Sequence, residues 1–339
     1  MSTPMKIGDG EAGPGEHAIG WIDVARRASG DALRLAVHMV NGAEDGPTLG
    51  LFGTSHGDET FGVEIMRAVV ESVDPGRLKG ALAVMPIGNP IAFESFTRTT
   101  GQGMNTDKNN LNREFPGDER GWLTEQIAYG ISSQYVPHLD CLIDFHSGGL
   151  ESALDYILVE EPRNDVDEQG YELAKLCGTE MLFMMKGKAH SGTLTQYARS
   201  QGIPAVIAEL GGCVASDAAY LKRSVQGIRN VMVHLGMIEG QIELPPVQYV
   251  LHRRTLLRPK HGGLFIPQVG FDRLAKTVPG GTTLCRVICP HTFEELETIE
   301  APYDPTLLIM MRGVLSRVNP GDYGYILGDW NSAERIENS

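Results

Sequence analysis

The sequence predicts an α/β fold with a mixed, largely parallel sheet and helices on both faces, followed by a small C-terminal all-β domain. From about residue 31 to residue 236, short apolar runs alternate with stretches of helical periodicity, which is typical of an α/β domain. After Gly240 the helical period disappears, and Pro245-Pro246 opens a stretch dense in Gly, Pro, Val and Thr. We therefore expect three parts, an N-terminal extension (1–30), an α/β domain (31–240) and a C-terminal β-domain (245–335).

The individual elements of the α/β region follow from its apolar patterns and its turn residues. Strands are expected at residues 32–40, 48–53, 81–87, 141–145, 156–159 and 205–210. Helices are expected between them at residues 59–73, 124–135, 166–177, 193–201 and 217–235. Pro75-Gly76, Gly88-Asn89-Pro90 and Gly202-Ile203-Pro204 are turn signals that separate these elements.

The C-terminal β-domain contains an apparent internal duplication. Residues 278–282 (VPGGT) loosely repeat as residues 318–322 (VNPGD), and each is followed by an apolar strand. This pattern resembles the barrel-sandwich hairpins of lipoyl and biotinyl domains, but Leu308-Ile309-Met310-Met311-Arg312 offers no attachment lysine. We expect a structural role or a cover over the active site.

Composition narrows the classes of partner. Lys and Arg number 29 against 43 Asp and Glu, so the net charge is -14, which disfavours nucleic acid and anionic lipid as partners. The N-terminus shows no signal peptide, and the apolar runs are too short to cross a bilayer. The sequence predicts a cytoplasmic protein that binds a small molecule, without a membrane or nucleic-acid partner, and it leaves homo-oligomerisation open.

Two short polar motifs each follow a predicted strand. His56-Gly57-Asp58-Glu59 follows the apolar run at residues 49–52, and His146 follows the run at residues 141–143. Since α/β sheets place their ligand sites at the carboxyl ends of strands, we expect the two motifs to meet. Two imidazoles and a carboxylate suit Zn²⁺ and leave one coordination position open for water. The alternative is a helix N-terminus at which Asp58 and Glu59 favour the helix dipole.

Further polar residues complete a candidate hydrolytic site. Glu209 ends the apolar run at residues 205–208, so its carboxylate is expected to be desolvated and suited to take a proton from water. The alternative is a strand-end glutamate paired with a lysine or arginine. Asp144 lies two residues before His146, hence on the same side of the strand, where it could orient the imidazole.

The loop at residues 98–117 supplies groups that suit a substrate. Asn112 and Arg113 could present an amide and a planar guanidinium to a substrate carboxylate, and Arg98 could meet an oxyanion. The alternative is that these side chains are simply solvated.

Together these motifs resemble the succinylglutamate desuccinylase and aspartoacylase family, which is related in fold to the zinc carboxypeptidases. The resemblance covers roughly residues 15–335, and Asp144-Phe145-His146-Ser147-Gly148-Gly149 is most similar to the branch that includes Nα-acetyl-diaminobutyrate deacetylase. It implies one Zn²⁺ per chain and a small N-acyl amino acid as substrate. By position in the motifs, the resemblance implies that zinc is held by His56, Glu59 and His146. It also implies that Glu209 activates the water and that Arg98 polarises the scissile carbonyl. The substrate carboxylate would be bound by Asn112 and Arg113.

Three other interpretations stay open on the sequence alone. Gly53-Thr54-Ser55-His56-Gly57 matches the nucleophile elbow of a serine hydrolase that would use Ser55. Its partners would be Asp144 with His190, or Glu209 with His261. A zinc carboxypeptidase acting on peptides would have the same core, and a binding protein would have a degenerate site.

Overall fold

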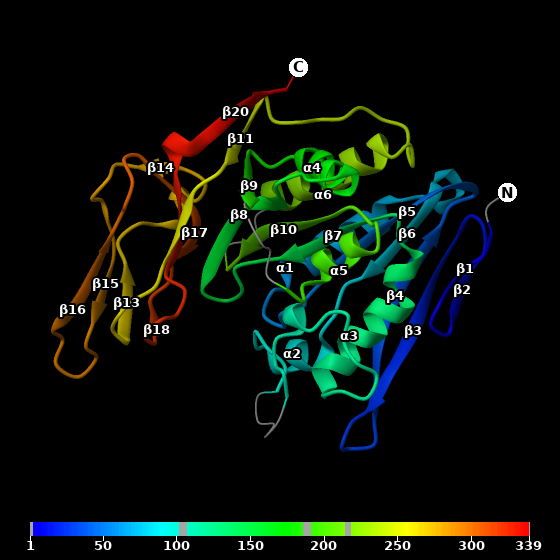
Figure 1. Ribbon diagram of the computed structural model, residues 1–339, viewed down its shortest axis with the longest axis horizontal. Coiled ribbons are helices and arrows are strands. Elements are labelled where there is room, and N and C mark those ends of the chain that lie inside the picture. Colours follow the sequence, from blue (N-terminus) through cyan, green and yellow to red (C-terminus); the bar gives the residue numbers. More distant parts are fainter. Residues whose placement is uncertain (1–2, 102–106, 186–190, 214–217, 339) are drawn as a thin grey trace.

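The computed structural model describes residues 3–101, 107–185, 191–213 and 218–338, and it contains one 14-stranded mixed sheet (Figure 1). Its longest path runs in the order β12-β19-β17-β8-β10-β7-β5-β6-β4-β3. The strands up to residue 212 are β1 (Met5–Ile7), β2 (Gly10–Ala12), β3 (Glu16–Arg26), β4 (Ala32–Asn41), β5 (Glu44–Gly53), β6 (Lys79–Met85), β7 (Cys141–His146), β8 (Ser152–Glu160), β9 (Met181–Met185) and β10 (Ala205–Gly212). Strands β6, β5, β7 and β10 are parallel neighbours, whereas β3 with β4, β4 with β6, and β8 with β10 pair antiparallel. The predicted mixed, largely parallel arrangement is confirmed for the central strands.

Helices cover both faces of this sheet, as predicted (Figure 1). They are α1 (Phe61–Ser72), α2 (Pro90–Ser95), α3 (Leu123–Gln134), α4 (Asp165–Leu176), α5 (Leu194–Ser200) and α6 (Ala218–His234). Short 3₁₀ turns lie at η1 (Pro75–Arg77), η2 (Leu111–Arg113), η3 (Val136–His138), η4 (Phe271–Arg273) and η5 (Trp330–Ser332). Apolar side chains of α1, α4 and α6 share one core with the sheet, while those of α2, α3 and α5 share a second core. No helix in the described part of the chain is long and apolar enough to cross a membrane.

The first 30 residues contain three of these strands. Strand β3 pairs with β4 along its length, from Glu16 opposite Asn41 to Arg26 opposite Ala32. Its inward-facing side chains are small or aliphatic, including Ala18, Gly20 and Ile22, so its apolar signal is weak. Strand β3 therefore extends the large sheet beyond β4, whereas β1 and β2 pair with each other in a separate two-stranded sheet.

The C-terminal region forms the small antiparallel sheet that the sequence predicts and also extends the large sheet. Its strands are β11 (Val247–Leu251), β12 (Arg254–Leu257), β13 (Gly263–Pro267), β14 (Thr277–Val278), β15 (Thr283–Ile288), β16 (Glu295–Glu300), β17 (Thr306–Arg312), β18 (Ser316–Val318), β19 (Tyr325–Asp329) and β20 (Ala333–Glu337). Strands β16-β15-β13-β18 form a separate four-stranded sheet, whereas β17 pairs with β8 and β11 pairs with β9. Hydrogen bonds thus connect the two regions, and the division at residues 240–245 stays a proposal about domain organisation. Because β17 lies beside β8, the C-terminal region reaches the carboxyl edge of the central strands.

Candidate active site

The carboxyl ends of β5, β7 and β10 bring the predicted site residues together. Within the parallel register, Phe52 on β5 lies beside Asp144 on β7, and His146 lies beside Glu209 on β10. After β5 the chain turns at Thr54, which has a φ of 56°. Gly57 then passes so close to α2 that a Cβ there would lie 1.9 Å from the Ala92 carbonyl carbon. This tight path carries His56 and Glu59 over the sheet edge.

His56, Glu59 and His146 form a buried group that can hold a metal ion. Their ligand atoms all lie within 4.8 Å of one another, and no other group of three His, Cys, Asp or Glu in the described residues meets this criterion. The Nδ1 atoms of His56 and His146 each lie 2.8 Å from a different oxygen of the Glu59 carboxylate. The exposed fractions of the three residues are 3%, 3% and 5%, respectively. Two imidazole nitrogens and one carboxylate, all desolvated, match the ligand preference of zinc.

The charge state of Glu59 suits this role. Burial opposes ionisation, but His56 and His146 hold the pKa of the Glu59 carboxyl well below its usual range. Arg98 adds to this environment, because its Nη1 donates to Glu59 Oε1 at 2.6 Å while its side chain is 47% exposed. Glu59 is therefore an anion available for a cation at neutral pH.

Neighbouring polar groups hold both histidine rings in place. His146 Nε2 lies 3.2 Å from Asp144 Oδ2 and 3.0 Å from the Asn112 amide nitrogen, so the expected contact between Asp144 and His146 is present. His56 Nε2 lies 3.2 Å from Asn110 Oδ1. Partners on the second ring nitrogen fix the orientation of a histidine ligand and leave Nδ1 of each ring facing Glu59.

Asn112 and Arg113 lie on η2 at the edge of the same cavity. The Leu194 amide at the start of α5 donates to Asn112 Oδ1 at 3.0 Å, so the Asn112 NH₂ group faces the site. Arg113 Nη1 donates to the Asn112 carbonyl at 2.5 Å, and the described residues provide no carboxylate partner for its guanidinium. An unpaired guanidinium beside an oriented amide is suited to bind an anionic group.

Glu209 lines a cavity of about 230 Å³ together with the metal-binding group. Burial raises the pKa of the Glu209 carboxyl to about 7. No hydrogen bond or ion pair of this carboxylate occurs within the described ranges, so the alternative of a strand-end pair with lysine or arginine is not observed. A carboxylate with a pKa near neutrality can both accept and return a proton.

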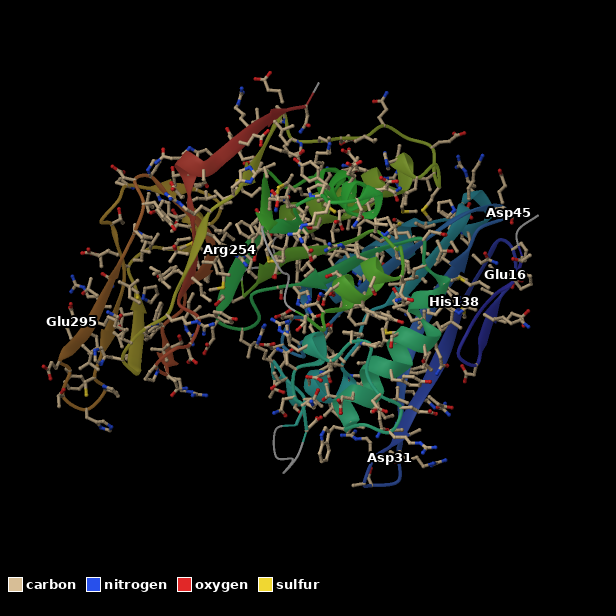
Figure 2. All side chains as sticks on the ribbon, in the orientation of Figure 1. Glu16, Asp31, Asp45, His138, Arg254 and Glu295 are labelled. Atoms are coloured by element: carbon tan, nitrogen blue, oxygen red, sulfur yellow. The ribbon has the colours of Figure 1, made fainter. Side chains whose placement is uncertain are left out.

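The C-terminal region contributes residues to the cavity that the sequence analysis did not single out. They are Arg254 and Leu256 of β12, Met310 of β17, Ile326 of β19, and Tyr323, which lies just before β19. Arg254 lies where the C-terminal region meets the α/β region (Figure 2). It donates from Nη1 to the Tyr156 hydroxyl at 3.3 Å, and its guanidinium carbon stacks 4.2 Å from the Phe183 ring centroid. No local motif marks Arg254, because only the pairing of β12, β19 and β17 brings it to β8.

The described residues do not assemble the serine-hydrolase arrangement. Ser55 is fully buried, and its Oγ has no hydrogen-bond partner among the described residues. Neither Ser55 nor His261 lines the cavity, and His190 lies outside the described residues. The His56 side chain next to Ser55 instead contacts Glu59.

A buried His-Glu-His group beside a cavity at the edge of an α/β sheet defines the class of metal-dependent hydrolases. The family model described as the succinylglutamate desuccinylase/aspartoacylase catalytic domain matches residues 45–235. The chain belongs to this family, so the resemblance noted from the motifs is confirmed. It therefore belongs to a deacylase family and carries a His-Glu-His group that can hold a metal ion.

Individual relatives support this placement. The chain is 32% identical over 216 residues to N-alpha-acetyl-L-2,4-diaminobutyric acid deacetylase of Halomonas elongata. The alignment covers 63% of this chain and 62% of that relative, which is less than two thirds of the relative's length. Two solved structures share the fold at 23% identity. One is a succinylglutamate desuccinylase from Silicibacter sp. TM1040, with a TM-score of 0.81 and coverage of 98% of both chains. The other is the product-bound ectoine utilization protein EutE (DoeB) from Ruegeria pomeroyi, with a TM-score of 0.82 and coverage of 97% of this chain and 99% of that one.

Proposed function

We propose that the protein is a zinc-dependent amidohydrolase that removes the acyl group from a small N-acyl amino acid. The observation that carries this proposal is the convergence of the metal-binding group and the Glu209 carboxylate in one cavity. The size of that cavity, about 230 Å³, supports a small substrate rather than a peptide. Arg254, Met310 and Ile326 of the C-terminal region line the cavity and would restrict a longer chain.

The proposed zinc is held by His56, Glu59 and His146. When bound, zinc acidifies a water molecule and polarises the acyl carbonyl. Glu209 takes a proton from the attacking water and later delivers it to the leaving amine. Arg98 lies 2.6 Å from Glu59, where its guanidinium can stabilise negative charge on the carbonyl oxygen.

Asn112 and Arg113 are proposed to bind the substrate carboxylate. The bond from the Leu194 amide fixes the Asn112 side chain, and the Arg113 guanidinium has no carboxylate partner among the described residues. Together they would orient the scissile amide toward Glu209.

The particular substrate is proposed from the named relative. Since the Halomonas protein is named for N-alpha-acetyl-L-2,4-diaminobutyric acid, the acetylated form of this amino acid is the first candidate. The direct test is hydrolysis by the zinc-loaded protein of a panel of N-acetyl and N-succinyl amino acids that includes this compound. Release of free amine from at least one member supports the proposal. Cleavage of peptides alone would instead indicate a zinc carboxypeptidase.

Replacing Arg113 by alanine is expected to lower kcat/KM by about 10- to 100-fold, mostly through a higher KM. The reason is that a charge-assisted pair with the substrate carboxylate contributes in both the bound and transition states. Steady-state kinetics on the best panel member measures the effect. Arg120→Ala is the control, because Arg120 is an exposed arginine of the same loop region that does not line the cavity. Equal KM values for Arg113→Ala and the wild type would remove Arg113 from the substrate site.

A further inference from the structure

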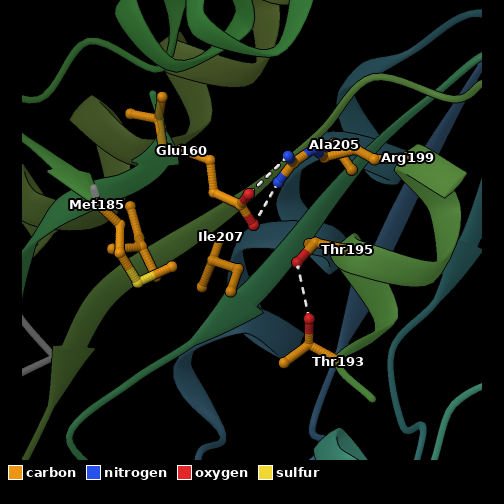
Figure 3. Close-up of a pocket in the computed structure, with 9 residues that line it drawn as sticks. Glu160, Met185, Thr193, Thr195, Arg199, Ala205 and Ile207 are labelled. Atoms are coloured by element: carbon orange, nitrogen blue, oxygen red, sulfur yellow. Dashed lines mark hydrogen bonds and ion pairs between the residues drawn. The ribbon is translucent and has the colours of Figure 1, made fainter. Parts of the chain in front are cut away.

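A thin wall of side chains separates the catalytic cavity from a second, smaller cavity. The second cavity has a volume of about 40 Å³ (Figure 3). It shares the lining residues Leu158, Thr193 and Ile207 with the catalytic cavity. Its other side is lined by Glu160 and Arg199, among others. We call the three shared residues, Leu158, Thr193 and Ile207, the partition. The space beyond the partition is therefore adjacent to the place where a substrate would bind.

Two residues of the partition stand on neighbouring strands of the central sheet. Ile207 on β10 lies directly opposite Leu158 on β8 in the antiparallel register. Ile207 also lies two residues before Glu209, so both side chains are on the same face of β10. Side chains on paired strands are held rigidly and cannot easily move aside for a ligand.

The partition lies beside the residues proposed to bind the substrate carboxylate. Thr193 begins α5, where its Oγ1 accepts a hydrogen bond from the Gln196 amide at 3.2 Å. The next amide, that of Leu194, donates to Asn112 Oδ1 at 3.0 Å. In an N-acyl amino acid the carboxylate and the side chain share the α-carbon, whereas the acyl group is across the scissile amide. With the substrate carboxylate at Asn112 and Arg113, as proposed, the partition would face the amino-acid side chain rather than the acyl group.

The far side of the small cavity is closed by a satisfied ion pair. Arg199 Nη2 donates to Glu160 Oε2 at 2.7 Å and also lies 2.8 Å from Asp167 Oδ1. Figure 3 shows the Glu160 carboxylate and the Arg199 guanidinium facing each other. Joining the two cavities would therefore add room without leaving a charge unpaired.

We propose that Leu158 and Ile207 limit the length of the amino-acid side chain that the active site accepts. The substrates are then N-acyl derivatives of amino acids with short side chains. This inference rests on the proposed function, because it assigns Asn112 and Arg113 to the substrate carboxylate. A longer side chain would collide with the partition, and shortening Ile207 would open the way into the space behind it.

The test compares the wild type with Ile207→Ala, both zinc-loaded, on two series of substrates. One series lengthens an uncharged side chain through N-acetyl-alanine, 2-aminobutyrate, norvaline and norleucine. The other lengthens the acyl group on one short amino acid. For the wild type, kcat/KM should fall by about tenfold or more for each methylene beyond the limit. For Ile207→Ala the limit should move by at least one methylene, while the acyl series should keep its wild-type order.

Two further variants make the comparison specific. Val206→Ala is the matched control, because Val206 is the buried neighbour on β10 and lines neither cavity. Val206→Ala should leave the kcat/KM values of both substrate series unchanged. Ile207→Val removes only one methylene and should give a smaller shift in the same direction, so it serves if Ile207→Ala does not fold.

The outcomes separate this inference from the proposed function. Wild-type hydrolysis of short substrates with no shift in either Ile207 variant would overturn the inference and leave the proposed function standing. A shift in the acyl series instead of the side-chain series would also overturn it. Failure of the zinc-loaded wild type to hydrolyse any member of either series would overturn both.

Discussion

Replacing Glu209 by glutamine is expected to lower kcat by about 10²- to 10⁴-fold without reducing the bound zinc. Glutamine has nearly the same shape but cannot accept the proton of the attacking water. Glu209 is placed for this step because it lies beside His146 in the strand register and lines the same cavity. Burial, which raises the pKa of this carboxyl to about 7, gives it a basicity matched to neutral pH. Steady-state kinetics together with zinc content by atomic spectroscopy measure the two effects.

The control for this variant is Glu239→Gln. Glu239 is an exposed glutamate that follows α6 and does not line the cavity, so its replacement should leave kcat unchanged. Near-normal turnover by Glu209→Gln with full zinc content would remove Glu209 from the proposed proton transfer. A loss of zinc along with turnover would instead assign Glu209 to the metal site.

Replacing His146 by alanine is expected to abolish tight zinc binding and to lower kcat/KM by about 10³-fold or more. The site would retain only two of its three ligands, and a bound metal supplies several kcal/mol of transition-state stabilisation. Loss of the imidazole also leaves Glu59 without one of its two 2.8 Å partners. Zinc titration followed by calorimetry, and activity at saturating zinc, measure these effects.

His138→Ala is the matched control for the histidine change. His138, labelled in Figure 2, is an exposed residue of η3 that does not line the cavity, so zinc binding and activity should stay at wild-type values. Thermal melting of the zinc-free proteins shows whether the His146→Ala chain is folded. A folded His146→Ala protein with wild-type zinc affinity would contradict the proposed ligand set.

The central strands and the metal-binding group were predictable because their signals are local and strong. The runs before His56, His146 and Glu209 are almost wholly apolar, so each residue is a polar group at the end of a buried strand. Parallel strands present such ends at one edge, and this geometric rule brings the three residues together without any further information.

Other parts of the fold and site were not predictable from local pattern. Strand β9 is the short run MLFMM, which lacks β-branched residues and cannot be told from a helical segment by periodicity. Strand β3 buries small residues, so its alternation is faint. Arg254 reaches the cavity only because β17 pairs with β8, a contact between segments about 150 residues apart in the chain.

The pairing of C-terminal strands with strands of the α/β region was likewise not predictable from local sequence patterns. The change in composition near Pro245 correctly indicates a change from helix to strand. It gives no sign that β11 and β17 pair with β9 and β8, because strand pairing across such a distance depends on the assembled sheet. The lining of the cavity by Leu256, Met310 and Ile326 follows from that pairing.

The most direct test of the account is the dependence of amide hydrolysis on zinc. The protein is stripped with a chelator, dialysed, and assayed on the best N-acyl amino acid before and after addition of zinc in stoichiometric steps. If amide hydrolysis depends on zinc, turnover should be lost on stripping and should return in proportion to added zinc, with its maximum at one zinc per chain. Full turnover by the zinc-free protein would contradict zinc-dependent hydrolysis and would favour a serine hydrolase that uses Ser55.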